Sequence, residues 1–325
     1  RFSTAQKIAL SFLMVILIGT VLLMMPIAHQ NHQAYPFIDS LFTATSATCV
    51  TGLVVDVTAS EFTLFGQIVI MLLIQIGGLG LMTLMAVFIL LLKSRLSMHE
   101  KIAMKEMLNQ EQVFNMHRFL LDILKYTLLF EGGGMILLSF RFIPEFGLFS
   151  GLFKAMFLAV SAFCNAGFDL MGKNEPYSSL TLYYDDVLVN VVIMALIIIG
   201  GIGFIVWDDI SNHKWNMKKY MLHTKIVLAM SLFLIIAGSI CFYFFEYRNL
   251  CAFDTKGQIL ASVFGAVTPR TAGFNTIDTG AYSEAGRMLT VVLMFIGGSP
   301  GSTAGGIKTT TMVVILLYAW STLRN

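Results

Sequence analysis

The sequence predicts an all-α polytopic membrane protein built from pseudo-repeated helix–short helix–helix units. Composition is the first observation behind this prediction: 57% of the 325 residues are apolar and only 12% are charged, whereas a soluble domain carries about 25% charge. The second is a series of apolar stretches long enough to cross a bilayer. The third is a pair of short motifs that recurs three times in the same order. So little charge argues against a water-soluble enzyme and against a disordered chain.

Charge and cysteine content narrow the function classes further. The net charge is +2 and the chain has no basic run of the kind that binds nucleic acid, so we expect a lipid bilayer and no nucleic acid as its surroundings. The four cysteines follow no Cys-x-x-Cys pattern, which favours small side chains within a helix bundle over a zinc site or a disulfide framework. The first apolar stretch is too long for a signal-peptide core and is interpreted as a retained span.

Six stretches are long enough to cross a hydrocarbon core of about 30 Å, which needs about 20 helical residues. We expect these spans at Ile8–Ala28, Phe62–Leu92, Phe119–Phe142, Tyr184–Trp207, Ile226–Tyr247 and Arg287–Leu323. Shorter apolar runs lie between the two spans of each pair, at Phe37–Ala47, Gly151–Cys164 and Gly257–Val267. Because these runs cannot cross the bilayer, they predict re-entrant half-helices buried in protein or lining a water-filled cavity.

The distribution of Lys and Arg predicts the orientation. These residues are enriched in the segments that would be cytoplasmic if the N-terminus is inside, and all three short runs then enter from the outer side. The expected organisation is repeat 1 at 1–93, a cytoplasmic connector at 94–118, repeat 2 at 119–207, a second connector at 208–225, and repeat 3 at 226–325 with an intramembrane loop at 297–308. The stretch 94–117 is expected to form an amphipathic helix or hairpin.

Internal repetition is the strongest signal. Each short run ends in a turn with one glycine, and the three turns align as Ser46–Gly52, Ser161–Gly167 and Val267–Gly273. The second span of each unit then carries Ile-Gly-Gly, at Ile76–Gly78, Ile199–Gly201 and Ile296–Gly298. Two motifs that recur in the same order indicate three copies of one unit.

The repeated turn points to the dehydration of a monovalent cation. A half-helix entering from outside directs its partly negative C-terminal end toward the membrane centre, and glycine lets consecutive carbonyl oxygens face one axis. A ring of such oxygens can replace the water shell of an ion. Asp56, Asp169 and Asp278 follow the three glycines. They either concentrate cations at an outer mouth or are ordinary solvated acids at the ends of spans.

These features resemble the Trk/Ktr/HKT superfamily of potassium transporters, and most of all the membrane subunit of its Ktr branch, because the sequence begins directly with the first unit. The resemblance implies four pseudo-repeats around a central pore, three of which this sequence supplies. It also implies potassium uptake across the cell membrane, a homodimer and a cytosolic nucleotide-binding regulatory ring of the KtrA type. K⁺ is the transported ion, Na⁺ is a candidate activator, and no organic cofactor is expected.

The resemblance also assigns a selectivity filter to the end of each turn. In the family, glycine in every loop accompanies potassium selectivity and serine in the first loop accompanies sodium permeation. The predicted ion-binding residues are Val50, Thr51, Gly52, Asn165, Ala166, Gly167, Thr271, Ala272 and Gly273. The alternative is that these glycines only end short helices. Arg270 is expected to point away from the axis and to pair with a carboxylate or carbonyls behind the filter.

The segment 297–306 holds five glycines and a proline and cannot continue a helix. Within a membrane its freed backbone groups need protein or water partners, and the resemblance assigns this loop to a gate. The predicted gate residues are Gly297, Gly298, Gly301, Ser302, Thr303, Gly305, Gly306 and Lys308. Lys308 is expected to lie beside the pore. The alternatives are that its side chain extends to the cytoplasmic interface or that it pairs with a helix C-terminus. The shorter breaks at 77–80 and 200–203 predict kinks or close packing.

Two rival functions are weighed against a pore. A sodium- or proton-coupled secondary cation symporter is the alternative, although many such carriers use inverted repeats and these repeats are parallel. An intramembrane enzyme would need a nucleophile–base pair or metal ligands at membrane depth, and no such pair is evident, so no enzymatic activity is expected. Glu131 in the third span is expected to hold a neighbouring helix or to line a lateral crevice.

Overall fold

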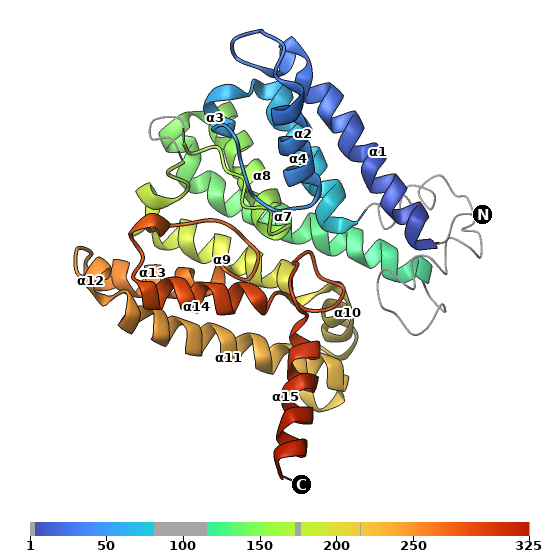
Figure 1. Ribbon diagram of the computed structural model, residues 1–325, viewed down its shortest axis with the longest axis vertical. Helices are drawn as coiled ribbons and strands as arrows, with labels where there is room; N and C mark the ends of the chain where they lie inside the picture. The colour runs from blue at the N-terminus through green and yellow to red at the C-terminus, as the bar shows by residue number, and fades with distance from the viewer. Residues whose placement is uncertain (1–3, 81–115, 173–176, 215, 325) are drawn as a thin grey trace. The chain divides into compact units, whose positions relative to one another are not determined.

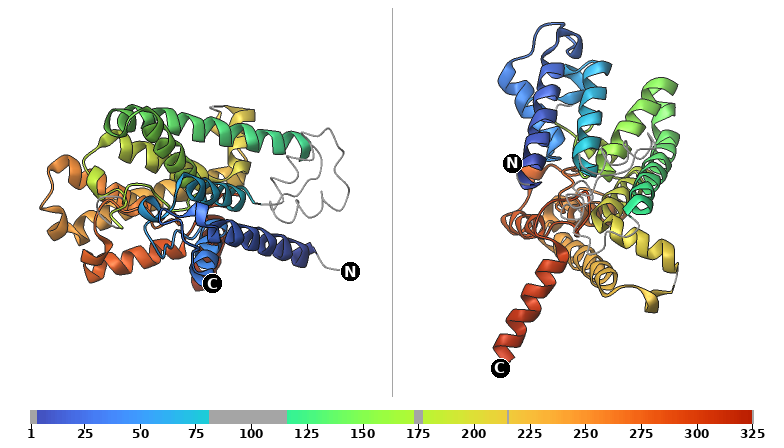
Figure 2. Two further views of the ribbon diagram at one scale, coloured as in Figure 1. Left: turned by 90° about the horizontal axis from the view of Figure 1, so that it is seen from above. Right: turned by 90° about the vertical axis from the view of Figure 1, so that its right-hand side faces the viewer.

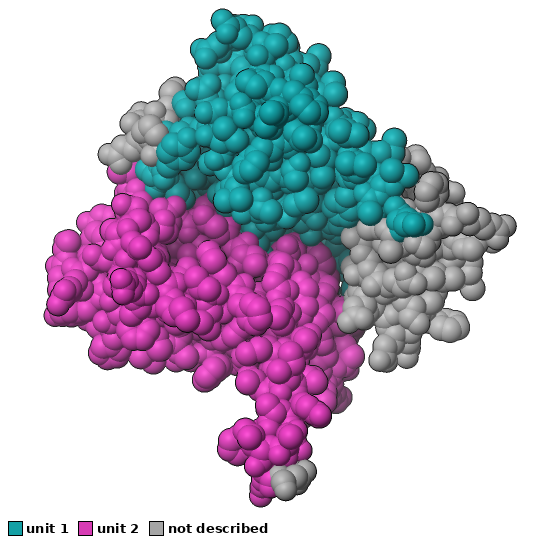
Figure 3. All heavy atoms as spheres, viewed as in Figure 1, with its two compact units in different colours: residues 1–179 teal, residues 180–325 magenta. Residues whose placement is uncertain are grey.

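The computed structural model describes residues 4–80, 116–172, 177–214 and 216–324. Within these ranges every regular element is a helix, apart from two isolated β-bridges that join His29 to Phe62 and Ile296 to Ile307. The end of the predicted second span, and residues 94–115 of the first predicted connector, lie outside the described residues. The chain divides into two compact units, Arg1–Ser179 and Leu180–Asn325 (Figure 3), each of which is described by itself.

The first unit contains two of the predicted half-helices. Its helices are α1 (Thr4–Met24), α2 (Phe37–Thr48), α3 (Thr58–Glu61), α4 (Leu64–Leu79), α7 (Met116–Phe146) and α8 (Leu148–Phe163). The half-helix α2 packs against α1 and α4, and the half-helix α8 packs against α7 and α4 (Figures 1 and 2). Helix α4 therefore contacts the half-helix of its own predicted repeat and that of the next predicted repeat.

The second unit is built in a similar way. Its helices are α9 (Val187–Ile202), α10 (Phe204–His213), α11 (Leu222–Phe245), α12 (Tyr247–Leu250), α13 (Thr255–Val267), α14 (Glu284–Phe295) and α15 (Thr309–Arg324). The half-helix α13 packs against α11, α14 and α9, and α15 contacts α11 (Figure 1). Helix α9 belongs to the predicted repeat before that of α13, so α9 contacts the next half-helix as α4 does in the first unit.

Side-chain caps explain where four helices begin. The backbone N–H of Gly66 donates to the Thr63 hydroxyl at the start of α4, at 3.4 Å. The carboxylates of Asp186 and Asp254 accept the first free N–H groups of α9 and α13, at 3.1 and 2.9 Å, and the Ser283 hydroxyl caps α14 at 3.0 Å. Short polar side chains are the residues that satisfy these otherwise unpaired donors.

The predicted spans are recovered to different degrees. Phe119–Phe146 and Leu222–Phe245 are each long and apolar enough to cross a membrane as one helix. Helix α1 has 21 residues, about 30 Å of helix, and the sixth predicted span is broken between α14 and α15 as expected. The half-helices have 12, 16 and 13 residues, which is too short for a crossing.

The fourth predicted span is interrupted at 200–203, where the sequence predicted a kink or close packing. Helices α9 and α10 meet at a bend of 93°, where Gly203 has a φ of 101°. A residue with a side chain rarely adopts this backbone conformation, so the glycine allows the chain to leave the helix axis. The expected kink at 200–203 is therefore a sharp break.

The surfaces of both units are rich in large apolar side chains. Ile38 is 75% exposed and Phe149 is 87% exposed in the first unit, and Leu222 and Tyr318 are about as exposed in the second. A soluble monomer rarely exposes so much contiguous apolar surface. Such surfaces fit a protein that is embedded in a lipid bilayer.

Candidate functional site: the glycine turns and the intramembrane loop

The three predicted filter segments share one backbone pattern. In each, the first residue and the glycine two positions later have positive φ, and the residue between them does not. The angles are 56°, 56° and 68° at Val50, Asn165 and Thr271, and 77°, 73° and 86° at Gly52, Gly167 and Gly273. In an extended strand successive peptide groups point in opposite directions. Alternating handedness instead orients successive peptide groups alike, which is what a carbonyl-lined path needs.

Helix-ending hydrogen bonds create the first positive φ in two of the turns. The N–H of Thr51 donates to the Ser46 carbonyl at 2.9 Å, and the N–H of Ala166 donates to the Ser161 carbonyl at 2.8 Å. Both bonds span six residues, as in a Schellman motif. In the third turn the N–H of Ala272 instead donates to the Thr268 carbonyl, one residue nearer, at 3.0 Å.

Two of the left-handed residues are β-branched. Val50 and Thr271 adopt positive φ despite side chains that disfavour it, at a cost of about 1–3 kcal/mol each. Such strain persists only where the surroundings impose the conformation. Around Val50 the second span lies close: a Cβ atom on Gly77 would collide with the Thr48 carbonyl and lie 3.0 Å from Val50 Cγ2.

The first two filter segments lie against each other within the first unit. A Cβ atom added to Gly52 would lie 2.6 Å from the carbonyl oxygen of Ala166 and 3.3 Å from Cα of Gly167. Only a residue without a side chain fits at this approach. The two segments therefore adjoin directly.

The Ile-Gly-Gly motif of α4 explains how this helix fits behind both turns. Gly77 faces Thr48 of the first turn, and a Cβ on Gly78 would lie 2.6 Å from the Sγ atom of Cys164 in the second turn. Two consecutive glycines let the helix backbone approach two of the predicted filter turns at once. This close packing agrees with the interpretation made from the sequence.

In the second unit, the third turn contacts the intramembrane loop. The backbone N–H of Gly305 donates to the Thr271 hydroxyl at 3.1 Å. Thr271 is a predicted filter residue and Gly305 a predicted gate residue, so the two predicted elements share a direct hydrogen bond. Sequence reasoning assigned Thr271 only a backbone role; no sequence signal indicated that its side chain reaches the loop.

The loop is also tied to the glycines at the bend between α9 and α10. Ser299 N–H donates to the Gly201 carbonyl at 2.9 Å, and Thr303 N–H donates to the Gly200 carbonyl at 3.3 Å. In return, the N–H of Phe204 donates to the Gly301 carbonyl at 2.9 Å. The backbone groups freed by the two helix breaks therefore satisfy one another, as a non-helical segment at membrane depth requires.

The loop closes on itself at its base. The N–H groups of Gly297 and Gly298 donate to the carbonyls of Ile307 and Gly305, each at 3.1 Å, so a Cβ atom on Gly297 would collide with Gly305. Lys308 Nζ donates to the Ala304 carbonyl at 2.7 Å. Lys308 thus binds the loop itself instead of the helix C-terminus considered from the sequence.

Side-chain hydroxyls complete the loop. The buried Ser299 hydroxyl lies 3.0 Å from that of Thr309, at the start of α15, and the Ser302 hydroxyl donates to the Ser299 carbonyl at 2.6 Å. These bonds join the middle of the loop to the helix that follows it.

Arg270 points away from its filter segment into the helices behind it. Its side chain is buried, and its guanidinium donates to the Ser231 hydroxyl on α11 at 3.1 Å. Within the described chain this hydroxyl takes the place of the carboxylate or carbonyls expected from the sequence.

The three aspartates after the glycines have structural partners. Asp56 accepts a hydrogen bond from the Tyr35 hydroxyl. Asp169 accepts the N–H of Met171 at 2.9 Å, and Asp278 accepts the N–H of Gly280 at 2.8 Å. Each therefore orders the loop that follows its filter segment.

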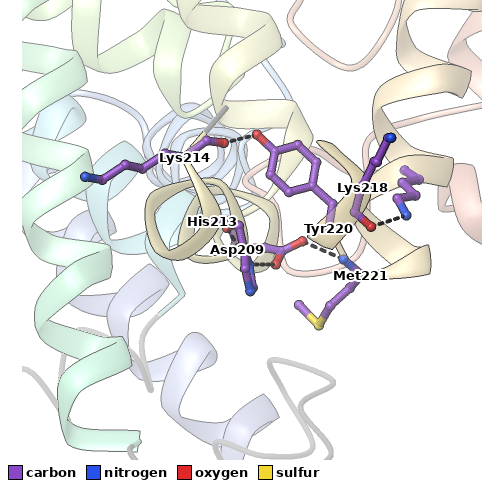
Figure 4. A network of polar contacts seen from close by, with 7 residues as sticks. Asp209, His213, Lys214, Lys218, Tyr220 and Met221 are labelled. Atoms are coloured by element: carbon purple, nitrogen blue, oxygen red, sulfur yellow. Dashed lines mark hydrogen bonds and ion pairs between the residues drawn. The ribbon is translucent and has the colours of Figure 1, made fainter. Parts of the chain in front are cut away.

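The described residues of the predicted second connector, 208–225, comprise the end of α10, a short 3₁₀ helix at Met217–Lys219 and the start of α11, and polar contacts join them (Figure 4). The buried carboxylate of Asp209 accepts the N–H of Met221 and contacts Nδ1 of His213, both at 2.9 Å, and the Tyr220 hydroxyl donates to the Lys214 carbonyl. Four lysines remain on the surface of this segment: Lys214, Lys218, Lys219 and Lys225.

The fold and the geometry of the turns together define an all-helical integral membrane protein whose short half-helices end in glycine turns. A family model described as TrkH, cation transport protein, matches residues 3–324. The potassium/sodium uptake protein NtpJ of Enterococcus hirae is 43% identical over 321 residues, 98% of this chain and 69% of that protein. The Ktr system potassium uptake protein B of Bacillus subtilis is 42% identical over 328 residues, 100% of this chain and 72% of that protein.

The fold agrees with these matches. The crystal structure of the potassium transporter TrkH from Vibrio parahaemolyticus aligns with a TM-score of 0.72 at 19% identity, over 97% of this chain and 62% of that one. The chain thus spans about six tenths of the solved TrkH chain. It belongs to the TrkH family of cation transport proteins, in the Trk/Ktr superfamily, and is KtrB-like. This is a family of transporters and not of enzymes.

Proposed function

We propose that this protein takes up K⁺ across the cell membrane through a channel-like pore whose selectivity filter is lined by backbone carbonyls. One observation carries the proposal: the same positive-φ pattern recurs in three separate turns. The predicted filter residues are the ones that adopt it. Carbonyl rings of this kind replace the water shell of a monovalent cation, and a potential that is negative inside contributes about 2.3 kcal/mol per charge per 100 mV to uptake.

We propose that the loop 297–308 is the gate. Its support is the hydrogen bond from Gly305 to Thr271, which joins the loop to the third filter segment. Hydrogen bonds to Gly200, Gly201 and Thr271 hold the loop in place, so opening would require that these bonds break.

We also propose how the protein is regulated and assembled. The exposed lysines of the connector 208–225 contact a cytosolic nucleotide-binding ring of the KtrA type. The N-terminus is then cytoplasmic, as the lysine and arginine distribution predicts. The protein acts as a homodimer in the plasma membrane. Na⁺ is a candidate activator or co-transported ion, since one relative carries both ions in its name.

Potassium uptake by cells that lack their own K⁺ uptake systems tests the function. The full-length protein should restore growth at low K⁺ and take up K⁺ in preference to Na⁺. A variant lacking residues 301–306 loses the N–H group that binds Thr271 and should show a higher basal K⁺ flux. Absence of K⁺ uptake by the expressed, membrane-inserted protein would refute the function; unaltered basal flux in the deletion variant would refute the gate.

A further inference from the structure

A buried polar cluster lies directly behind the second filter segment. Glu131, in the middle of α7, is 9% exposed. Its Oε2 accepts a hydrogen bond from Nε2 of Gln75 on α4, at 3.3 Å. The thiol of Cys164 lies 3.9 Å from Glu131 Oε1 and 3.8 Å from Gln75 Oε1. Three polar side chains from three elements thus meet at one point inside the first unit.

The carboxyl group of Glu131 is not explained by a contribution to the stability of the fold. A carboxyl group at membrane depth is costly unless a cation compensates it, and Glu131 has no ion-pair partner in the described part of the first unit. The described residues of α4 carry no charge. On α8, Lys154 lies 3.6 Å above the Phe146 ring, and on α7 itself Arg141 pairs with Glu145 at 2.7 Å.

Asp122 and Lys125 stand on α7 nine and six residues before Glu131, about 2.5 and 1.7 turns, and neither spacing places a residue on the helix face of Glu131 as its direct neighbour. An apolar side chain of similar size would fill the same space at less cost. The polar group is therefore retained for what it contacts.

Glu131 contacts the residue at which the second filter segment begins. Cys164 is the residue that ends α8, and the next residue, Asn165, begins the second filter segment with its left-handed backbone. Gln75 immediately precedes the Ile-Gly-Gly motif, whose Gly78 packs on Cys164. The cluster therefore links the second span of repeat 1 to the point where the filter of repeat 2 starts.

We propose that Glu131 and Gln75 are positioning residues for ion selectivity: through Cys164 they hold the second filter segment from behind by neutral hydrogen bonding. The inference rests on the proposed potassium uptake and adds the residues that keep its filter in register. The Ala166 carbonyl of the second filter segment lies against Gly52 of the first. A displacement of Cys164 would therefore move the second segment and, through this contact, the first.

The ratio of K⁺ to Na⁺ uptake in proteoliposomes is the readout, because it does not depend on how much protein is inserted. E131A removes both carboxyl oxygens and should lower the ratio by about tenfold, the effect of one lost buried hydrogen bond. E131Q retains an oxygen and an N–H group and should keep the ratio within about twofold. S139A is the matched control, since the buried Ser139 hydroxyl donates to the Met135 carbonyl of its own helix and to no other group in the described part of the chain.

The outcomes separate the two proposals. A wild-type protein without K⁺ uptake refutes the function itself. With wild-type uptake intact, an unchanged ratio in E131A overturns the positioning role, and a loss in E131Q as large as in E131A shows that charge, not hydrogen bonding, is needed and also overturns it. Should E131A fail to fold, C164A removes the link while leaving Glu131 and Gln75 in place; a lowered ratio supports the inference and an unchanged ratio overturns it.

Discussion

Substitution of Gly52 by serine perturbs the point where the first two filter segments meet. The new Cβ would start 2.6 Å from the Ala166 carbonyl oxygen, whereas side-chain carbons do not approach heavy atoms closer than about 3.0 Å. The oxygen must therefore move by several tenths of an ångström. In addition, Gly52 has a φ of 77°, which costs a residue with a side chain about 1–2 kcal/mol.

The displaced oxygen is one of those proposed to replace the water shell of K⁺. If the shift removes about 1–2 kcal/mol of the preference for K⁺, the ratio of K⁺ to Na⁺ uptake falls about five- to thirtyfold. Proteoliposomes containing the full-length variant, assayed with each ion as the sole permeant cation, give this ratio directly.

A second glycine provides the control. A Cβ atom on Gly132 in α7 meets no other atom within 4 Å, so Gly132→Ser should leave the ratio unchanged. The reasoning is refuted if Gly52→Ser transports K⁺ and discriminates against Na⁺ as well as the wild type does.

Two further predictions concern the gate and the loop after α1. Thr271→Val keeps the shape of the side chain but removes the acceptor for the Gly305 N–H, so the loop loses about 1 kcal/mol of anchoring and basal K⁺ flux should rise about fivefold. Thr290→Val, whose hydroxyl binds its own helix at Gly286, is the control, and equal flux in both variants would contradict the link. Burial lowers the pKa of His29, which lies between α1 and α2 outside the spans. The neutral ring therefore contributes stability that is complete above about pH 6.5 and is lost as the pH falls below it. The Tm of the wild type should decline over this range more steeply than that of His29→Gln, and parallel declines would count against it.

Much of the architecture was predictable because it depends on local properties of the chain. Stretch length separates helices that can cross a bilayer from half-helices that cannot, and α2, α8 and α13 appear where the short runs predicted them. The three turn glycines were predicted to permit unusual backbone angles, and each has positive φ.

Other features contradict local preference and needed the folded structure. Val50 and Thr271 are β-branched, and neither favours a left-handed backbone, yet both adopt it. The break at Gly203 is far sharper than the predicted kink, because the carbonyls and N–H groups freed there are bound by the loop 299–303. A sequence pattern does not show which distant segment supplies such partners.

The sequence by itself determined the membrane-embedded helices, the repetition of the unit and the positions of its glycines, since these follow from hydrophobic length and from the handedness each residue tolerates. Only the tertiary structure decided which groups meet: Thr271 with Gly305, and Glu131 with Cys164. These partners are more than thirty residues apart along the chain. Their contact depends on how whole helices pack, and helix packing is a property of the entire unit.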